Sequence, residues 1–161
     1  MTGIITLLTD FGSVYPGIMK GVLLGINPEA AIVDISHEVN SIKEGCFILN
    51  YAAREFPSNT IHMAVVDPGV GTDRKGLIIE RANGIFVGPD NGLLSPPRKG
   101  IESRVYAIDE SGLEERGFRI GKTFHGRDVF SPVSALLSKG IPAAELGERT
   151  KDYRHIDLFG G

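Results

Sequence analysis

Cysteine is almost absent from this chain of 161 residues, since Cys46 is the only one. A single thiol excludes an internal disulfide and a cysteine-based zinc cluster, and it fits a reducing compartment. The chain also lacks an excess of basic charge, because 17 Lys and Arg stand against 20 Asp and Glu and the net charge is -3. A phosphate backbone is held by a basic surface, so we expect no nucleic-acid partner.

Long apolar runs are missing as well, and none approaches the roughly 18 residues that a transmembrane helix needs. The first twelve residues, MTGIITLLTDFG, lack a basic start, and Thr9 and Asp10 interrupt their apolar stretch, unlike a signal peptide. We therefore expect a cytoplasmic protein with no membrane partner. The hydrophobic share of 42% and the charged share of 23% are typical of globular chains.

Short runs rich in Ile and Val predict strands at residues 4–9, 31–35, 61–66, 77–81, 85–88 and 104–108. Several lack polar alternation, as do strands that are buried on both faces. Between the first three runs lie an apolar helical stripe at residues 17–26 and a capping box, Ser41 and Glu44, that opens a helix toward Phe56. This order predicts an α/β fold with a largely parallel sheet and helices on both of its faces.

The second half of the chain has weaker signals. Asn83-Gly84 between two apolar runs predicts a hairpin, and residues 127–139 predict a helix that ends at Gly140. Residues 156–159 have the composition of the start of a further strand. We find no repeat and no linker, so residues 1–161 are predicted to form a single domain.

Four of the predicted strands end in an aspartate: Asp10, Asp34, Asp67 and Asp90. The ligand crevice of an open parallel sheet lies beyond the carboxyl ends of its strands, so we expect these carboxylates to line one cleft. Glycine is abundant, with 21 residues, and TDFG, DPGVG and GPDNG place glycines beside three of the four. An aspartate after a strand also serves simply to cap a turn, and that alternative stays open.

Clustered carboxylates suit either a divalent metal or a ribose with a cationic substrate. The sequence has no HExxH and no DxDxDG loop, which favours the second chemistry and predicts no metal site. GVG at residues 69–71 does not continue as a dinucleotide fingerprint, and GFRIGKT at residues 117–123 is one residue short of a P-loop. Of the four histidines, His125 is best placed to hold water or an anion, beside Gly126 and before a helix.

Several motifs occur in a fixed order: TDFG (9–12), MKG (19–21), IVDISHE (32–38), VVDPGVG (65–71), Arg74, PDNG (89–92) and TFHGRD (123–128). This set resembles the S-adenosylmethionine hydrolases, also called SAM hydroxide adenosyltransferases, which are relatives of the fluorinating and chlorinating enzymes. The resemblance extends over nearly the whole chain. It implies a Rossmann-like three-layer αβα sandwich and the hydrolysis of S-adenosylmethionine to adenosine and L-methionine, with water attacking the ribose 5′ carbon.

The resemblance also implies roles for single residues. The family's proposed water-activating trio falls on Asp67, Arg74 and His125. Substrate binding falls on Asp10, which would hold the ribose, and on Asp67 and Asn91. The halogenating relatives have other residues at the positions of His125 and Asp67, so this chain is more similar to the hydrolases. No cofactor is expected, because S-adenosylmethionine is the substrate.

Family members carry a C-terminal β-rich domain that completes the substrate pocket between the subunits of a trimer. We expect that domain to be missing from residues 1–161 and the protein to be a homotrimer. Two other functions remain open. One is a metal-dependent hydrolase of nucleosides or phosphates that uses Asp10, Asp34 and Asp67, and the other is a nucleoside-binding domain without catalysis.

Overall fold

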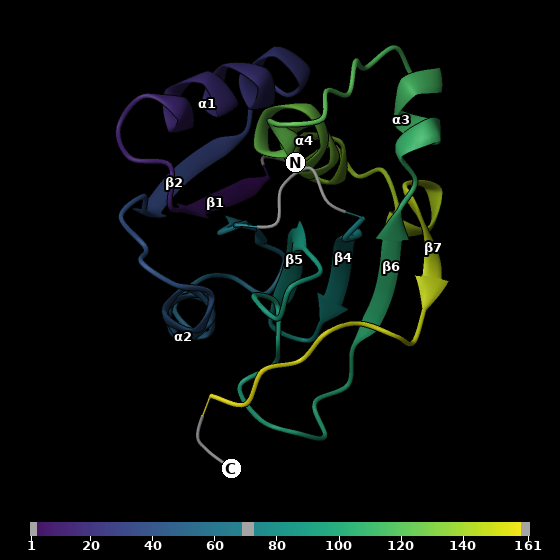
Figure 1. The fold of residues 1–161 in the computed structure, drawn as a ribbon. Helices are drawn as coiled ribbons and strands as arrows, with labels where there is room; N and C mark the ends of the chain where they lie inside the picture. Colours follow the sequence, from purple (N-terminus) through teal and green to yellow (C-terminus); the bar gives the residue numbers. More distant parts are fainter. Residues whose placement is uncertain (1–2, 69–72, 159–161) are drawn as a thin grey trace.

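The computed structural model describes residues 3–68 and 73–158, which form a mixed α/β fold around one seven-stranded sheet (Figure 1). The strands are β1 (Ile4–Thr9), β2 (Ala31–Ser36), β3 (Ile61–Val65), β4 (Gly76–Arg81), β5 (Gly84–Pro89), β6 (Arg104–Ile108) and β7 (Gly147–Thr150). The helices are α1 (Tyr15–Ile26), α2 (Ile42–Ala53), α3 (Glu110–Glu115) and α4 (Ser131–Ser138), with a π-helical turn η1 (Gly126–Phe130) and a 3-10 turn η2 (Ala143–Glu145). None of the described helices has the length and apolar character needed to cross a membrane.

The sheet has the strand order β2-β1-β3-β5-β4-β6-β7, and its two halves differ in direction. The pairs β1 with β2, β1 with β3, and β3 with β5 are parallel, as predicted. The pairs of β4 with β5, β4 with β6, and β6 with β7 are antiparallel. The predicted hairpin explains why the strand direction changes between the two halves of the sheet. Only two residues separate β4 from β5, so the two strands must pair antiparallel.

Two hydrophobic clusters lie on opposite faces of the sheet. Leu7 belongs to a cluster with Leu23 of α1 and Val133 of α4, whereas the next residue, Leu8, belongs to a cluster with Leu49 of α2. Successive strand residues point to opposite faces, so α1 and α4 cover one face and α2 covers the other (Figure 1). The predicted combination of a sheet and helices in a mixed α/β fold is therefore confirmed.

The helix predicted at residues 127–139 forms, as η1 followed directly by α4. Its first turn is π-helical, since Pro132 has no N–H for a regular helical bond and the Ser131 hydroxyl donates to the Gly126 carbonyl at 2.6 Å. Another predicted element needs correction. The strand expected at residues 156–159 does not form over its described part. The Ile156 N–H donates to Ser95 Oγ at 2.8 Å, and the neighbouring Arg154 N–H donates to Asp90 Oδ1 at 2.7 Å, so side chains take the bonds that a strand would need. Residue 159 lies outside the described residues.

His62 is fully buried in the middle of β3 and takes no part in the candidate site. Its Nδ1 lies 2.7 Å from Thr6 Oγ1, and its ring stacks on Phe86 with 5.1 Å between centroids. Nε2 has no hydrogen-bond partner among the described residues. Burial lowers the pKa of His62 to about 4.

We expect His62 to make the fold less stable in mild acid. Below pH about 6.5 the unfolded chain protonates this histidine, whereas the folded chain does not until pH about 4. As the pH decreases from about 6.5 to about 4, the free energy of unfolding therefore decreases by about 3 kcal/mol in total. Urea unfolding at a series of pH values measures the slope. His62→Phe retains an aromatic ring that cannot be protonated, so the free energy of unfolding of this variant is expected to change less with pH. Equal pH dependence in the two proteins would contradict the assignment of this effect to His62.

Candidate active site

Carboxylates gather at the carboxyl ends of the parallel strands, as predicted. Asp10 directly follows β1, Asp67 follows β3 by two residues and Asp90 directly follows β5. Asp67, Arg74, Asp90 and Asn91 line one hollow of about 540 Å³ at this edge of the sheet. Burial raises the pKa of Asp10, and the nearby charge of Asp67 raises it further, so these two carboxylates lie close enough to interact.

Asp34 departs from the prediction. It lies inside β2, which continues to Ser36, so it does not end its strand. Its carboxylate is half-exposed, binds Lys20 Nζ through Oδ2 and lies 2.6 Å from His37 Nε2 through Oδ1. Burial would raise the pKa of Asp34, but the bonds and charges of Lys20 and His37 outweigh it and lower that pKa. Neither Asp34 nor Asp10 is among the residues that line the hollow, so the prediction that all four aspartates share one cleft holds only for Asp67 and Asp90.

Asp67 and Arg74 form a buried ion pair. Arg74 donates to Asp67 Oδ2 through both Nε, at 3.0 Å, and Nη2. The Asp67 side chain is 2% exposed and the Arg74 side chain is 8% exposed, so a surface ion pair is excluded. The guanidinium also lies over the Phe130 ring, 5.4 Å from its centroid, which fixes its plane from a second side.

His125 joins this pair through its Nδ1 atom, 3.0 Å from Arg74 Nη2. Since a guanidinium only donates, Nδ1 accepts and the ring proton resides on Nε2. Nε2 in turn donates to the Gly121 carbonyl at 3.0 Å. Both ring nitrogens of His125 are therefore engaged within the protein.

The second oxygen of Asp67 is the unusual atom of the site. Oδ1 is buried and has no hydrogen-bond partner among the described residues, whereas Oδ2 receives two donors from Arg74. A buried carboxylate oxygen without a donor is costly, so such an atom is expected to receive one from a bound molecule. The arrangement can accept a proton or a hydrogen bond at one defined position.

Asn91 lies in the lining of the hollow but uses its amide within the protein. Nδ2 donates to the Val66 carbonyl at 2.9 Å, and Oδ1 accepts from the Leu93 N–H at 3.1 Å. The first of these bonds holds the main chain immediately before Asp67. The structure therefore gives Asn91 a place in the wall, and its predicted contact with substrate stays a prediction.

Other predicted features are resolved in part. The GVG segment lies within residues 69–72, outside the described residues. In the segment that nearly matches a P-loop, the Gly121 N–H donates to Asp128 Oδ2 at 2.8 Å and its carbonyl receives His125, so this loop orients a histidine. Sequence reasoning missed Gly121 and Asp128 as partners of the site.

Among the described residues, no three His, Cys, Asp or Glu side chains could together hold a metal ion.

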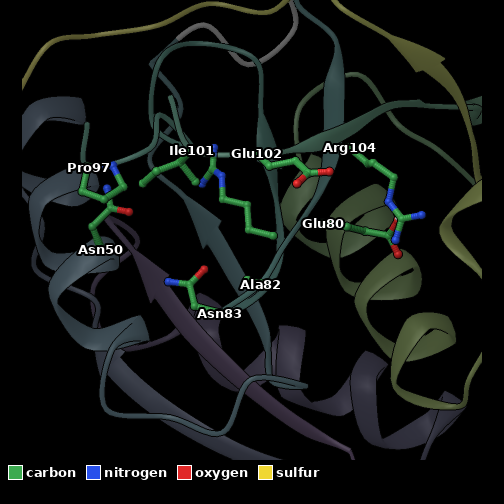
Figure 2. A pocket seen from close by; sticks show the side chains of 9 residues that line it. Asn50, Glu80, Ala82, Asn83, Pro97, Ile101, Glu102 and Arg104 are labelled. Carbon is green, nitrogen blue, oxygen red and sulfur yellow. The ribbon is translucent and has the colours of Figure 1, made fainter. Parts of the chain in front are cut away.

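A separate pocket lies at the opposite end of the sheet, where β4 leads into β5 (Figure 2). Glu80, Asn83 and Arg104 project from its wall, and Glu80 pairs with Arg104 at 3.4 Å. The guanidinium of Arg81 is occupied, since it donates to Ser103 Oγ at 2.9 Å and to the Leu94 carbonyl at 2.7 Å. These partners lie within the protein, so the pocket does not present Arg81 as a free binding group.

A family model described as the SAM hydroxide adenosyltransferase N-terminal domain matches residues 5–147. The (R)-S-adenosyl-L-methionine hydrolase of Methanocaldococcus jannaschii is 43% identical over 98% of this chain and 64% of its own length. The enzyme of the same name from Salinispora arenicola is 37% identical over 89% of this chain and 56% of its own length. A fluorinase of Actinoplanes sp. is more distant, at 27% identity over 92% of this chain and 59% of its own.

A solved structure is also similar to this chain in fold and sequence. An uncharacterized conserved protein from Thermotoga maritima matches with a TM-score of 0.87 and 37% identity, over 95% of this chain and 61% of its own. This chain thus spans less than two thirds of the length of the relatives it matches. The family model covers most of its residues, and the chain therefore belongs to the SAM hydroxide adenosyltransferase family, in the part that forms the N-terminal domain.

Proposed function

We propose that this chain carries the water-activating half of an S-adenosyl-L-methionine hydrolase, which releases adenosine and L-methionine. The observation that carries the proposal is the buried Asp67 Oδ1, which has no donor among the described residues while Arg74 holds Oδ2. Relatives named (R)-S-adenosyl-L-methionine hydrolase support the choice of substrate.

In the proposed reaction, a water molecule donates a hydrogen bond to Asp67 Oδ1 and attacks the ribose 5′ carbon. The new C–O bond forms as the bond from that carbon to sulfur breaks, and sulfur keeps the electron pair as the neutral thioether of methionine. The water proton passes to Asp67. Because attack by water removes the sulfonium charge, a pocket poor in water favours the step, provided that the nucleophile is held in line.

The geometry favours Asp67 over His125 as the proton acceptor. Both nitrogens of His125 are engaged, Nδ1 with Arg74 and Nε2 with the Gly121 carbonyl. His125 then orients Arg74, and Arg74 fixes Asp67 so that only Oδ1 is available. Asp10 is proposed to accept hydrogen bonds from both ribose hydroxyls, which an ionised carboxylate does well.

We also propose the features of the assembly that the family resemblance implies. Residues 1–161 would act as one three-layer αβα domain in a cytoplasmic homotrimer. Protein outside these residues would complete the pocket for adenine and methionine. No cofactor or nucleic-acid partner is proposed.

The test uses protein expressed from its full natural reading frame. Incubation with S-adenosylmethionine is expected to yield adenosine and methionine in equal amounts, measured by liquid chromatography and mass spectrometry. Turnover is expected to persist in excess chelator. Loss of turnover on chelation would favour the metal-dependent hydrolase, and adenosine binding without turnover would favour the non-catalytic domain. Substrate that stays intact and unbound would overturn the proposal.

A further inference from the structure

We propose that His37 is a positioning residue that fixes the turn carrying Asp10, so that the Asp10 carboxylate is set for the ribose hydroxyls. This inference rests on the function proposed above. It starts from Asp10 itself, whose carboxylate has no side-chain partner among the described residues. Its position therefore depends on the main chain of the turn between β1 and α1.

That turn is held on both sides of Asp10 by one residue. The His37 ring nitrogen Nδ1 lies 2.7 Å from Thr9 Oγ1, immediately before Asp10. Thr9 Oγ1 also accepts the Phe11 N–H at 3.2 Å, so this hydroxyl bridges across Asp10. Beyond it, the Gly12 N–H donates to the main-chain carbonyl of His37 at 3.0 Å. The ring and the backbone of His37 thus clamp the same turn.

The far side of the His37 ring is anchored in turn. Nε2 lies 2.6 Å from Asp34 Oδ1, and Asp34 Oδ2 binds Lys20 of α1. A carboxylate accepts, so Nε2 carries a proton, and with Nδ1 unprotonated the Thr9 hydroxyl donates to it. The chain from Lys20 through Asp34 and His37 to Thr9 ties α1 and β2 to the end of β1.

Burial distinguishes the contact between His37 and Thr9 from an ordinary surface contact, whereas Lys20 and Asp34 are partly exposed. Thr9 is fully buried, and the His37 side chain is only 16% exposed. Loss of the ring would leave a buried hydroxyl with one partner fewer, and the turn would be free to shift while the sheet below it stays intact. The expected defect is therefore in recognition of the ribose rather than in folding.

The experiment compares the binding of adenosine and 2′-deoxyadenosine by calorimetry, with protein from the full natural reading frame. The unchanged protein is expected to bind adenosine about tenfold more tightly, because the deoxy compound lacks one partner of Asp10. His37→Ala is expected to lose most of this discrimination. His37→Asn, which can still accept from Thr9, is expected to keep it. Thr9→Val, which is nearly isosteric, is expected to behave like His37→Ala and serves if that variant folds poorly.

His155→Ala is the matched control, because His155 lies in the C-terminal segment and its ring contacts that of Tyr153, with 4.2 Å between centroids. It should leave both affinities unchanged. If His37→Ala and Thr9→Val weaken both ligands equally, or weaken neither, the positioning role is overturned while the proposed function stands. If the unchanged protein binds neither adenosine nor S-adenosylmethionine, the proposed function itself fails.

Discussion

Asp67→Asn is expected to lower kcat for the hydrolysis of S-adenosylmethionine by about 10² to 10⁴, the usual contribution of a positioned general base. The amide keeps the size of the side chain but has no carboxylate oxygen to take the proton from water. Single-turnover measurements at saturating substrate isolate this step from binding. Circular dichroism checks that the variant is folded, since the change leaves Arg74 buried without a charge partner.

Asp90→Asn is the control for this variant. Asp90 also lines the hollow, but its Oδ1 accepts the Arg154 N–H at 2.7 Å, and no hydrogen bond or ion pair joins it to Arg74 or His125 among the described residues. Removing its charge is expected to weaken binding of the cationic substrate by a few-fold and to leave kcat nearly unchanged. A folded Asp67→Asn enzyme with kcat within threefold of the unchanged protein would remove Asp67 from the role of base.

Arg74→Met is expected to destabilise the fold by about 3 to 5 kcal/mol, because it leaves the Asp67 charge buried without a partner. Methionine fills much of the same space beside Phe130, so the effect comes mainly from the charge. Urea unfolding of the two single variants and of the double variant Asp67→Asn with Arg74→Met measures the coupling. The double variant is expected to recover much of the loss. A cost below about 1 kcal/mol for Arg74→Met would show that water reaches the pair.

The parallel half of the sheet was predictable because its strands are short apolar runs separated by helices with clear stripes or caps. β7 was not, since its sequence, GERT, has no apolar run and the strand forms only by pairing with β6. α3 was also missed. It begins after Asp109, whose side chain accepts the Gly112 N–H at 3.1 Å, but a glycine in its middle argues against a helix.

The candidate site shows the same division between local and distant contacts. Asp67 and Arg74 are seven residues apart, so their pairing is plausible from sequence. His125 lies 51 residues beyond Arg74; its local surroundings marked it as a candidate, but only the family resemblance placed it with this pair. The bond between Thr9 and His37 spans 28 residues and left no local pattern. Asp34 was assigned to the cleft because strand ends are hard to locate to within one or two residues.

Hydrolysis in water enriched in oxygen-18 tests most directly whether water activated at Asp67 attacks the ribose carbon. The unchanged protein is expected to release adenosine that carries the heavy oxygen at its 5′ position, together with unlabelled methionine. Asp67→Asn is expected to release neither at a comparable rate. Unlabelled adenosine, or label in methionine, would mean that another bond is broken or another nucleophile is used, and it would contradict the proposed reaction.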